Sequence, residues 1–302
     1  MDAIQKYMTT KIGWELYRSF LSVLKEGSLS AASRALDTTQ PTVGRHIEAL
    51  EKALGVALFT RSQLGLTPTA AALEMRGYAE AMEHTAASME RAAFSQGAGV
   101  SGVVRVTASE VIAAEVLPPM IRQLLTRYPD LKVELVLSNR VQDLLQREAD
   151  IAVRMVQPKQ EQLIARHIGK IELGLFAHPD YLRDHGTPKS KKDLADHAFI
   201  GFDQETAFIR AASKGLEGLS RKDFAVATDS NLAQLALMRN SVGIGICQSA
   251  LAKREPKLTR VLPKLYTLHM ETWVTMHEDL RNSPRCKVLF DALVEGLQAY
   301  VT

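Results

Sequence analysis

Residues 27–55 read GSLSAASRALDTTQPTVGRHIEALEKALG and decide the fold of the amino-terminal region. Ser28 can cap a short helix whose apolar stripe consists mainly of small side chains, so that another helix can approach closely. After a turn at 37–39, apolar side chains recur at helical spacing, at Val43, Ile47, Leu50 and Leu54. Gly55 then stands where such a helix ends. Two helices joined by a tight turn form a helix-turn-helix, whose second helix can enter the major groove of DNA.

The segments on either side extend this motif. Residues 14–25 place apolar side chains on one face and stop before Gly27, which predicts a preceding helix. Residues 56–67 have no helical period and predict a small hairpin or wing. From Thr69 to Phe94 the chain is rich in alanine and lacks proline, and its larger side chains repeat every seven residues. This pattern predicts one long helix.

The heptad repeat of the long helix predicts that two chains pair along it. The side chains assigned to this dimer interface are Met75, Tyr78, Met82, Thr85 and Met89. An amphipathic helix packed only against its own domain would show a similar pattern over three heptads. The position of the helix between two domains favours dimerisation.

The sequence after residue 97 predicts a different class of fold. Residues 97–102 are rich in glycine and other small residues, the composition of a joint between separately folded units. Strand-like segments then alternate with helical ones, including a helix expected at 111–128 and another at 141–147. Later strands are expected at 173–177, 199–202, 224–226, 244–247 and 272–276. Such alternation builds open sheets that helices cover on both faces.

The composition narrows the class of protein. A chain of 302 residues with 46% hydrophobic and 24% charged residues should fold into two or three soluble domains. Its longest apolar runs are too short to cross a bilayer and its first residues are not built like a secretory signal, so we expect a cytoplasmic protein that binds no membrane. The net charge of +3 favours a polyanionic partner only weakly.

The sequence holds no assembled catalytic or metal site. Cys247 and Cys286 lie far apart without CxxC spacing, and no HExxH, GxSxG or phosphate-binding glycine motif is present. We therefore expect no enzymatic activity, no metal and no cofactor.

Three side chains at the start of the predicted second helix of the motif suit DNA. The amide of Gln40 can pair with adenine, the hydroxyl and methyl groups of Thr42 suit phosphate or thymine, and the guanidinium of Arg45 suits guanine or phosphate. The same side chains are common on any solvated helix. The residues alone therefore leave DNA binding open.

Residues 14–72 resemble the winged helix-turn-helix of LysR-type transcriptional regulators. The resemblance is carried by GSLSAASRAL at 27–36, TQPTVGRHIEALE at 39–51, LGVALFTR at 54–61 and GLTPT at 65–69. It implies that Ser30, Arg34, Pro41 and Arg61 join Gln40, Thr42 and Arg45 in contacting DNA. It continues more weakly as LPP at 117–119, ADIAVR at 149–154, HPDYL at 178–182 and GIGI at 243–246.

The resemblance also implies a division of the chain. It comprises a winged helix-turn-helix at 1–68, a linker and dimerisation helix at 69–96, a hinge at 97–102 and an effector-binding domain at 103–302. That last domain resembles the periplasmic solute-binding fold, with lobe I at 103–167 and 270–302 and lobe II at 168–269. The expected protein is a transcriptional regulator that binds double-stranded DNA and a small-molecule effector as a homodimer, or as a homotetramer, since tetramers are frequent in the family.

Two alternatives belong to other classes. A solute-binding protein or a small lyase could use the same two-lobed fold, but neither would need a helix-turn-helix. A DNA-binding protein with an empty cleft would differ only in its response to ligands.

Ligands of open α/β sheets bind beyond the carboxyl ends of strands, which places the effector in the cleft between the lobes. The side chains expected there are Thr107, Ser109, Ser138, Asn139, Arg154, Phe202, Thr228, Asp229 and Ser230. Hydroxyl groups, one arginine and one aromatic ring suit a small polar ligand. Plain helix capping explains Thr107, Ser109 and Ser230 equally well. Glu110 and Glu115 argue against an anionic ligand.

Overall fold

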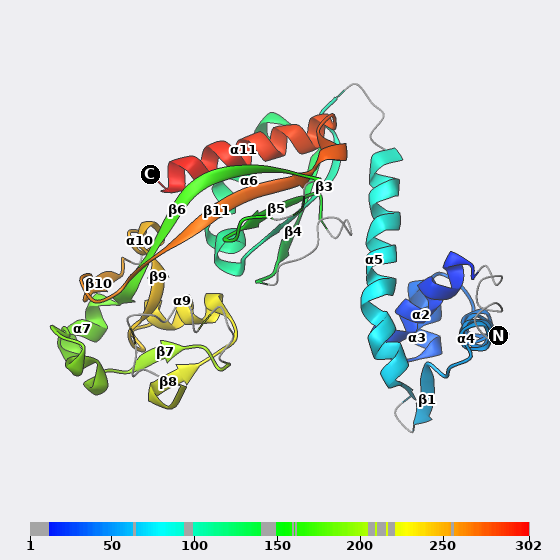
Figure 1. Cartoon of the computed structure of the whole chain (residues 1–302), viewed down its shortest axis with the longest axis horizontal. Helices are drawn as coiled ribbons and strands as arrows, with labels where there is room; N and C mark the ends of the chain where they lie inside the picture. Colours follow the sequence, from blue (N-terminus) through cyan, green and yellow to red (C-terminus); the bar gives the residue numbers. More distant parts are fainter. Residues whose placement is uncertain are drawn as a thin grey trace. The chain divides into compact units, whose positions relative to one another are not determined.

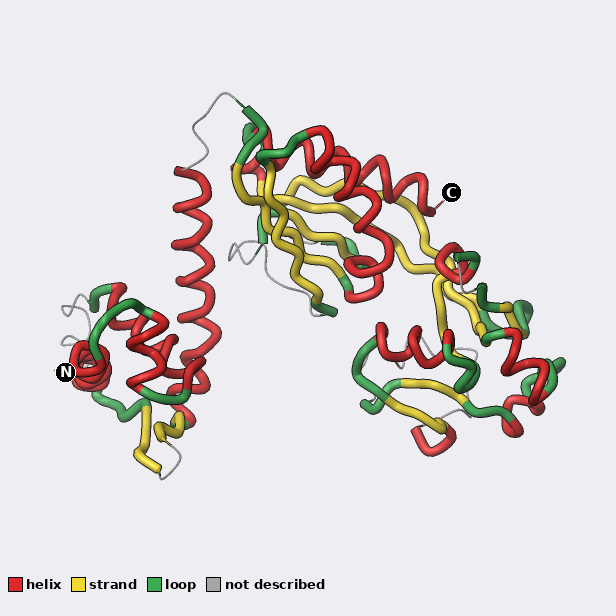
Figure 2. Tube along the Cα trace, turned by 180° about the vertical axis from the view of Figure 1, so that it is seen from behind, coloured by secondary structure: helices red, strands yellow, loops and turns green. Residues whose placement is uncertain are grey.

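The computed structural model describes residues 12–62, 65–93, 99–139, 149–158, 160, 162–204, 209, 216, 221–254 and 257–301. The chain divides into two compact units that part between Glu90 and Arg91. Figures 1 and 2 show the elements of each unit from opposite sides. The helix expected at 141–147 lies outside the described residues.

The first unit is a helix-turn-helix with a wing and a long helix (Figure 1). Its elements are α2 (Trp14–Glu26), α3 (Leu29–Ala35), α4 (Gln40–Leu54), β1 (Phe59–Ser62), β2 (Gly65–Pro68) and α5 (Ala70–Ala93). Strands β1 and β2 pair antiparallel. The core is apolar and fully buried, and includes Phe20, Leu21, Val23, Ala32, Val43, Leu50 and Leu58. Five of these residues have the helical spacing that predicted the three short helices: Phe20, Val23, Ala32, Val43 and Leu50.

The helix ends follow from individual residues. Ser28 caps α3, because its Oγ accepts the backbone N–H of Ala31 at 3.1 Å. Gly27 follows α2 and Gly55 follows α4, with φ of 72° and 73°. A side chain is strained in this left-handed region, so glycine is favoured at both ends.

Helix α5 packs one face against the three short helices. Ala72 and Ala79 are buried in the core of the first unit. On the same face, the Nζ of Lys25 in α2 lies 2.7 Å from a carboxylate oxygen of Glu83. The other faces of α5 are largely exposed.

The second unit is built on a curled mixed sheet with strand order β10-β6-β11-β5-β3-β4, and β9 also pairs with β6. The strands are β3 (Gly102–Ala108), β4 (Leu131–Leu137), β5 (Ile151–Arg154), β6 (Leu163–Ala177), β9 (Gly245–Gln248), β10 (Thr259–Val261) and β11 (Thr267–His277). Strand β3 runs parallel to both β4 and β5. Strands β6 and β11 are antiparallel and extend along the whole unit (Figure 2).

Strands β6 and β11 are longer than the sequence predicted, which placed strands only at 173–177 and 272–276. The first half of β6 was missed because it carries exposed polar side chains, such as Arg166, and contains Gly169. Gly169 has a φ of 137°, and the register of the pair shifts between Thr272 and Trp273, directly opposite. This bulge bends both strands at one place. The boundaries predicted at residues 168 and 270 lie beside it.

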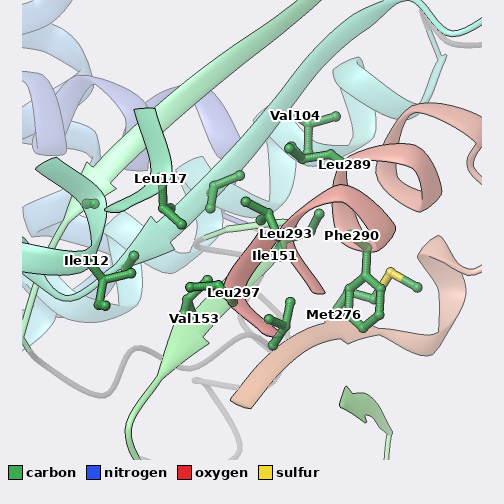
Figure 3. Packing of buried hydrophobic residues seen from close by; sticks show 14 of the residues in the cluster. Val104, Ile112, Leu117, Ile151, Val153, Met276, Leu289, Phe290, Leu293 and Leu297 are labelled. Carbon is green, nitrogen blue, oxygen red and sulfur yellow. The ribbon is translucent and has the colours of Figure 1, made fainter. Parts of the chain in front are cut away.

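We call lobe I the part on one side of this bulge. It contains β3, β4, β5, η1 (Ile112–Val116), α6 (Leu117–Arg127), η5 (Glu278–Leu280) and α11 (Pro284–Val301), with one end of β6 and β11. Helices α6 and α11 lie side by side against the sheet (Figure 1). Figure 3 shows their core, in which Leu289, Leu293 and Leu297 of α11 meet Val104, Ile151 and Val153 of the strands.

Lobe II lies on the other side of the bulge. It contains α7 (Pro179–His185), η3 (Lys192–Asp196), β7 (Phe199–Gly201), η4 (Arg221–Asp223), β8 (Phe224–Ala227), α9 (Asn231–Arg239), β9, α10 (Ser249–Ala252) and β10. Strands β7 and β8 are parallel and form a separate small sheet. No helix within the described residues is long and apolar enough to span a bilayer.

A proline pair shapes the start of lobe I. The sequence predicted one helix at 111–128, but residues Ile112–Val116 form a π-helical turn before α6 begins. In it, the N–H of Leu117 bonds to the carbonyl of Ile112. Pro118 and Pro119 have no N–H to continue the ladder, which leaves the carbonyl of Glu115 without its helical donor. The guanidinium of Arg254, from lobe II, donates to that carbonyl instead.

Candidate functional site

Helix α4 presents one apolar and one polar face. Val43, Ile47 and Leu50 are buried against the other helices. Gln40, Pro41 and Arg45 are exposed, and Thr42 is half-buried. The predicted DNA-contacting residues of α4 therefore lie together on its exposed side, around its first turns.

Neighbouring polar side chains are held by short contacts. On α3, an amine of Arg34 donates to the Oγ of Ser30 at 2.9 Å, and both side chains are exposed. At the start of α4 the hydroxyls of Thr39 and Thr42 lie 2.8 Å apart, and Arg45 reaches Thr42 at 3.5 Å. Arg61 lies in β1, but its side chain is outside the described residues.

Two further residues of α4 connect it to neighbouring elements. The Nδ1 of His46 lies 2.7 Å from the Oγ of buried Ser19 in α2, so this ring joins two helices. The Oε1 of Glu51 accepts the backbone N–H groups of Leu58 at 2.7 Å and Phe59 at 3.2 Å. No local sequence pattern indicates a role for Glu51, and only the tertiary fold reveals this contact with the start of the wing.

The exposed side of α5 carries large apolar side chains. Tyr78 is 78% exposed, Met89 65% and Met82 39%, and Thr85 is exposed beside them. They recur at intervals of four, three and four residues, so they share one face of the helix. Met75 was predicted to join them, but it is half-buried and packs against the core of the first unit.

The predicted effector residues lie at the carboxyl ends of strands in both lobes. In lobe I, Ala108 pairs with Leu137 of β4 and with Val153 of β5, so these three strands end at one edge. The lobe I residues at this edge are Thr107, Ser109, Ser138, Asn139 and Arg154. In lobe II, Gly201 pairs with Ala227, which brings the ends of β7 and β8 together. The lobe II residues there are Phe202, Thr228, Asp229 and Ser230.

Arg154 and Thr107 form a buried pair in lobe I. An amine of the Arg154 guanidinium donates to the Oγ1 of Thr107 at 2.6 Å, and another donates to the carbonyl of Val153. Arg154 is 9% exposed and Thr107 is fully buried. The sequence predicted both residues, and the structure brings them together.

Asn139 and Ser230 take part in contacts that join the lobes. The amide nitrogen of Asn139 donates to Oδ1 of Asn231 at 2.9 Å, and its Oδ1 accepts the N–H of Glu110 at 3.2 Å. The Oε2 of Glu110 accepts from the Oγ of Ser230 and from the N–H of Asn231, both at 2.9 Å. Glu110 and Asn231 are not among the predicted effector residues, although each is next to one of them in the sequence.

The carboxyl end of α9 is also tied to lobe I. Two amines of Arg239 donate to the two carboxylate oxygens of Glu115 at 2.8 and 2.9 Å. These hydrogen bonds lower the pKa of the Glu115 carboxyl and outweigh the effect of its burial. They likewise raise the pKa of Arg239. We call the set Glu110, Glu115, Asn139, Ser230, Asn231 and Arg239 the lobe junction.

Among the described residues, no group of three histidine, cysteine or acidic side chains could hold a metal ion. Cys247 and Cys286 are not joined in a disulfide, and both are buried. Burial raises the pKa of the Cys247 thiol to about 12, so it is protonated at neutral pH.

A separate hollow of about 310 Å³ lies in lobe II. Its lining residues are Glu172, Phe176, Ser249, Ala252, Lys253, Leu258 and Arg260. Glu172 pairs there with Arg260 at 2.6 Å and accepts from Ser249 at 2.7 Å. None of the predicted effector residues lines this hollow.

Two family models match the chain. One, the LysR substrate binding domain, matches residues 97–298, and the other, the bacterial regulatory helix-turn-helix protein of the lysR family, matches residues 14–73. Among curated proteins, the transcriptional regulator CrgA of Neisseria meningitidis serogroup C is 29% identical over 287 residues, covering 92% of this chain and 95% of CrgA. Its serogroup B counterpart is 34% identical over 185 residues, 61% of each chain.

Solved structures share the architecture. CrgA, described as a LysR-type transcriptional regulator from Neisseria meningitidis, matches with a TM-score of 0.57 at 26% identity, over 95% of this chain and 99% of CrgA. The Vibrio cholerae virulence activator AphB gives 0.60 at 23% identity, over 94% and 99%. CbnR in complex with its target DNA gives 0.65 at 21% identity, over 95% and 99%. AphB and CbnR are similar to this chain in fold.

Proposed function

Because this chain belongs to the LysR family of bacterial transcriptional regulators, we propose that it reads its operator through the exposed face of α4 and responds to a small molecule bound between its two lobes. The observation that carries this proposal is the division of α4 into a buried and an exposed face. Val43, Ile47 and Leu50 anchor the helix, which leaves Gln40 and Arg45 outward at its start. Amide and guanidinium groups there can reach base edges and phosphates.

Ser30, Arg34, Pro41, Thr42 and Arg61 complete the proposed DNA contacts. Ser30 and Arg34 are exposed and paired on α3, which precedes α4 in the motif. In a helix-turn-helix the first helix crosses the DNA backbone, so these two side chains suit phosphate. We assign positioning to them and base reading to Gln40 and Arg45.

A homodimer supplies the second recognition helix. Tyr78, Met82, Thr85 and Met89 form an exposed, largely apolar stripe on α5, which a second copy of the helix would cover. Two-fold symmetry then predicts an operator with two inverted half-sites. Two dimers can pair further into a homotetramer.

The effector acts by favouring one arrangement of the lobes. It binds among the polar side chains at the strand ends, with Arg154, Thr107 and Phe202 as candidate contacts. A ligand shifts the population of lobe arrangements only by its difference in affinity for them, typically about 1–3 kcal/mol. The protein needs no cofactor, catalyses no reaction and works in the cytoplasm, where its operator is.

The test is selection of bound sequences from random duplexes by the purified full chain, followed by binding measurements at rising salt. We expect an enriched sequence with inverted repeats, and an affinity that falls as salt rises. Repeating the measurement with a panel of metabolites should identify one that changes this affinity. A chain that ignores every duplex at low ionic strength contradicts the proposal.

A further inference from the structure

A carboxylate from lobe I sits on the first turn of a helix from lobe II. The Oε2 of Glu110 accepts one hydrogen bond from the Oγ of Ser230, the residue that caps α9, and one from the N–H of Asn231, the first residue of α9, each at 2.9 Å. We propose that Glu110 is a built-in occupant of the anion position at the lobe junction, which closes the junction without an effector and excludes carboxylates from it.

The first turn of α9 suits a negative charge. Helix α9 has nine residues, and its first N–H groups have no acceptor within the helix. These groups and the helix dipole attract an anion. The side chain of Glu110 supplies that anion from within the chain.

Asn139 holds the carboxylate in place. Its side chain accepts the backbone N–H of Glu110 and donates to the side chain of Asn231. The backbone that carries the carboxylate and the helix that receives it are therefore fixed to the same amide. Glu110 thus reaches α9 from a defined position.

Glu115 supplies a second, independent tie at the other end of α9. Its carboxylate takes two hydrogen bonds from Arg239, and its carbonyl takes one from Arg254. Glu110 precedes the π-helical turn and Glu115 lies within it, so one short segment of lobe I engages both ends of α9. The lobes are bridged by the chain's own charges.

This arrangement defines the class of effector, a step that rests on the proposed function. A carboxylate ligand at the first turn of α9 would find its hydrogen-bond donors already bound to Glu110. The negative charge of Glu110 would also repel it. A neutral or cationic polar molecule meets no such competitor, and an ammonium or hydroxyl group can donate to Glu110. Glu110 therefore determines specificity by excluding one ligand class.

Chemical rescue tests the proposal on the full chain. Glu110→Ala removes the carboxylate and leaves the donors of Ser230 and Asn231 open. We expect Tm to fall by roughly 2–4 °C, and sodium acetate to restore most of that loss relative to sodium chloride at equal ionic strength. The wild type should respond equally to both salts. Glu295→Ala, which removes an exposed carboxylate from α11, should behave as wild type.

The donors can be tested in the same background. Adding Ser230→Ala to Glu110→Ala removes one donor, and the response to acetate should shrink. Equal stabilisation of wild type and Glu110→Ala by acetate, or no effect of acetate on the variant, would overturn the proposal.

Glu110→Gln provides a second test, which holds even if the alanine variant does not fold. The amide oxygen can accept the same hydrogen bonds, so only the charge is lost. We expect a lower Tm than wild type at low ionic strength, with a difference that narrows as salt rises, because charge–dipole attraction is screened. A Tm equal to that of wild type at low ionic strength contradicts the role of the charge.

These measurements use neither DNA nor effector. A chain that binds no duplex but shows acetate rescue would overturn the proposed function and support the role of Glu110. A chain that binds its operator but shows no acetate rescue would support the proposed function and overturn the role of Glu110. A carboxylate effector that binds the wild type on the first turn of α9 would overturn the effector class.

Discussion

Arg239 and Glu115 form a bidentate ion pair between the lobes, in which each guanidinium amine donates to one carboxylate oxygen, at 2.8 and 2.9 Å. Each side chain is about one-quarter exposed, at 23% and 24%. Paired planar geometry of this kind is stronger and more directional than a single contact. The pair therefore orients α9 against lobe I as well as adding stability.

Glu115→Gln should make the stability of the second unit less dependent on pH. The pKa of Glu115 is lowered in the folded chain, mainly by its hydrogen bond with Arg239. The contribution of Glu115 to the free energy of unfolding is therefore present above the pKa of the unfolded chain. It is lost as pH falls through the pKa of the folded chain. We expect about 1 kcal/mol of destabilisation at pH 7, because the pair is partly exposed, and a smaller difference in acid.

Urea unfolding measures this effect through Trp273, which lies in β11, in a Trp14→Phe background that silences the first unit. Glu295→Gln serves as control, since it removes a charge from an exposed site on α11. A constant difference between wild type and Glu115→Gln from pH 7 into acid would contradict the assignment.

Arg45→Ala should weaken operator binding. If the guanidinium reads a base, the loss should be about 1–3 kcal/mol and confined to one position of the site. If it contacts phosphate, the dependence of affinity on salt should become shallower. Lys52→Ala removes a positive charge from the other end of α4 and serves as control. Unchanged affinity removes Arg45 from the DNA contacts.

Met82→Glu together with Met89→Glu should dissociate the dimer. Both side chains are exposed on one stripe of α5, and charges facing each other across a helix pair are unfavourable. Leu73→Glu is a matched control, because Leu73 is 51% exposed but lies nine residues from Met82, two and a half turns away and on the opposite side. Sedimentation velocity measures the outcome. If the dimer survives both substitutions, its interface lies elsewhere on the chain.

Glu51→Ala should loosen the start of the wing. One carboxylate oxygen of Glu51 accepts the N–H groups of both Leu58 and Phe59. Its removal should cost the first unit about 1–3 kcal/mol and weaken binding to all duplexes similarly, because no base contact is lost. Glu51→Gln keeps an acceptor and should recover part of the loss. Thermal unfolding and DNA titration of the two variants separate these effects.

Cys247 should be inert in the folded protein. Burial raises the pKa of its thiol to about 12, and only the thiolate attacks disulfides and alkylating agents. We expect no reaction with an aromatic disulfide reagent at pH 8 until the chain unfolds, for Cys247 and for the fully buried Cys286 alike. Rapid labelling of the native chain would indicate that Cys247 is accessible.

The sequence predicted the first unit well because its signals are local. The ends of α4 follow from Thr39, Pro41 and Gly55, and its buried face follows from Val43, Ile47 and Leu50. The contact of Glu51 with the wing could not be predicted in this way. Nothing near residue 51 indicates which distant N–H groups its carboxylate accepts.

The contacts of the lobe junction could likewise be predicted only in part from the sequence. Ser230 was visible as a helix cap, and Asn139 as a polar residue at a strand end. From the sequence, Glu110 argues only against an anionic ligand, because its role as an acceptor depends on a helix 120 residues further along the chain. The first half of β6 escaped notice because Gly169 and exposed polar residues interrupt the strand pattern.

The two long strands that pass through the bulge have a consequence for dissecting the molecule. Lobe II is an insertion carried on the antiparallel pair of β6 and β11, so removing it would cut through both strands at the bulge. Sliding one strand past the other by a residue would turn every side chain to the wrong face. We therefore expect the lobes to move by twisting about this strand pair and not by sliding of one strand along the other.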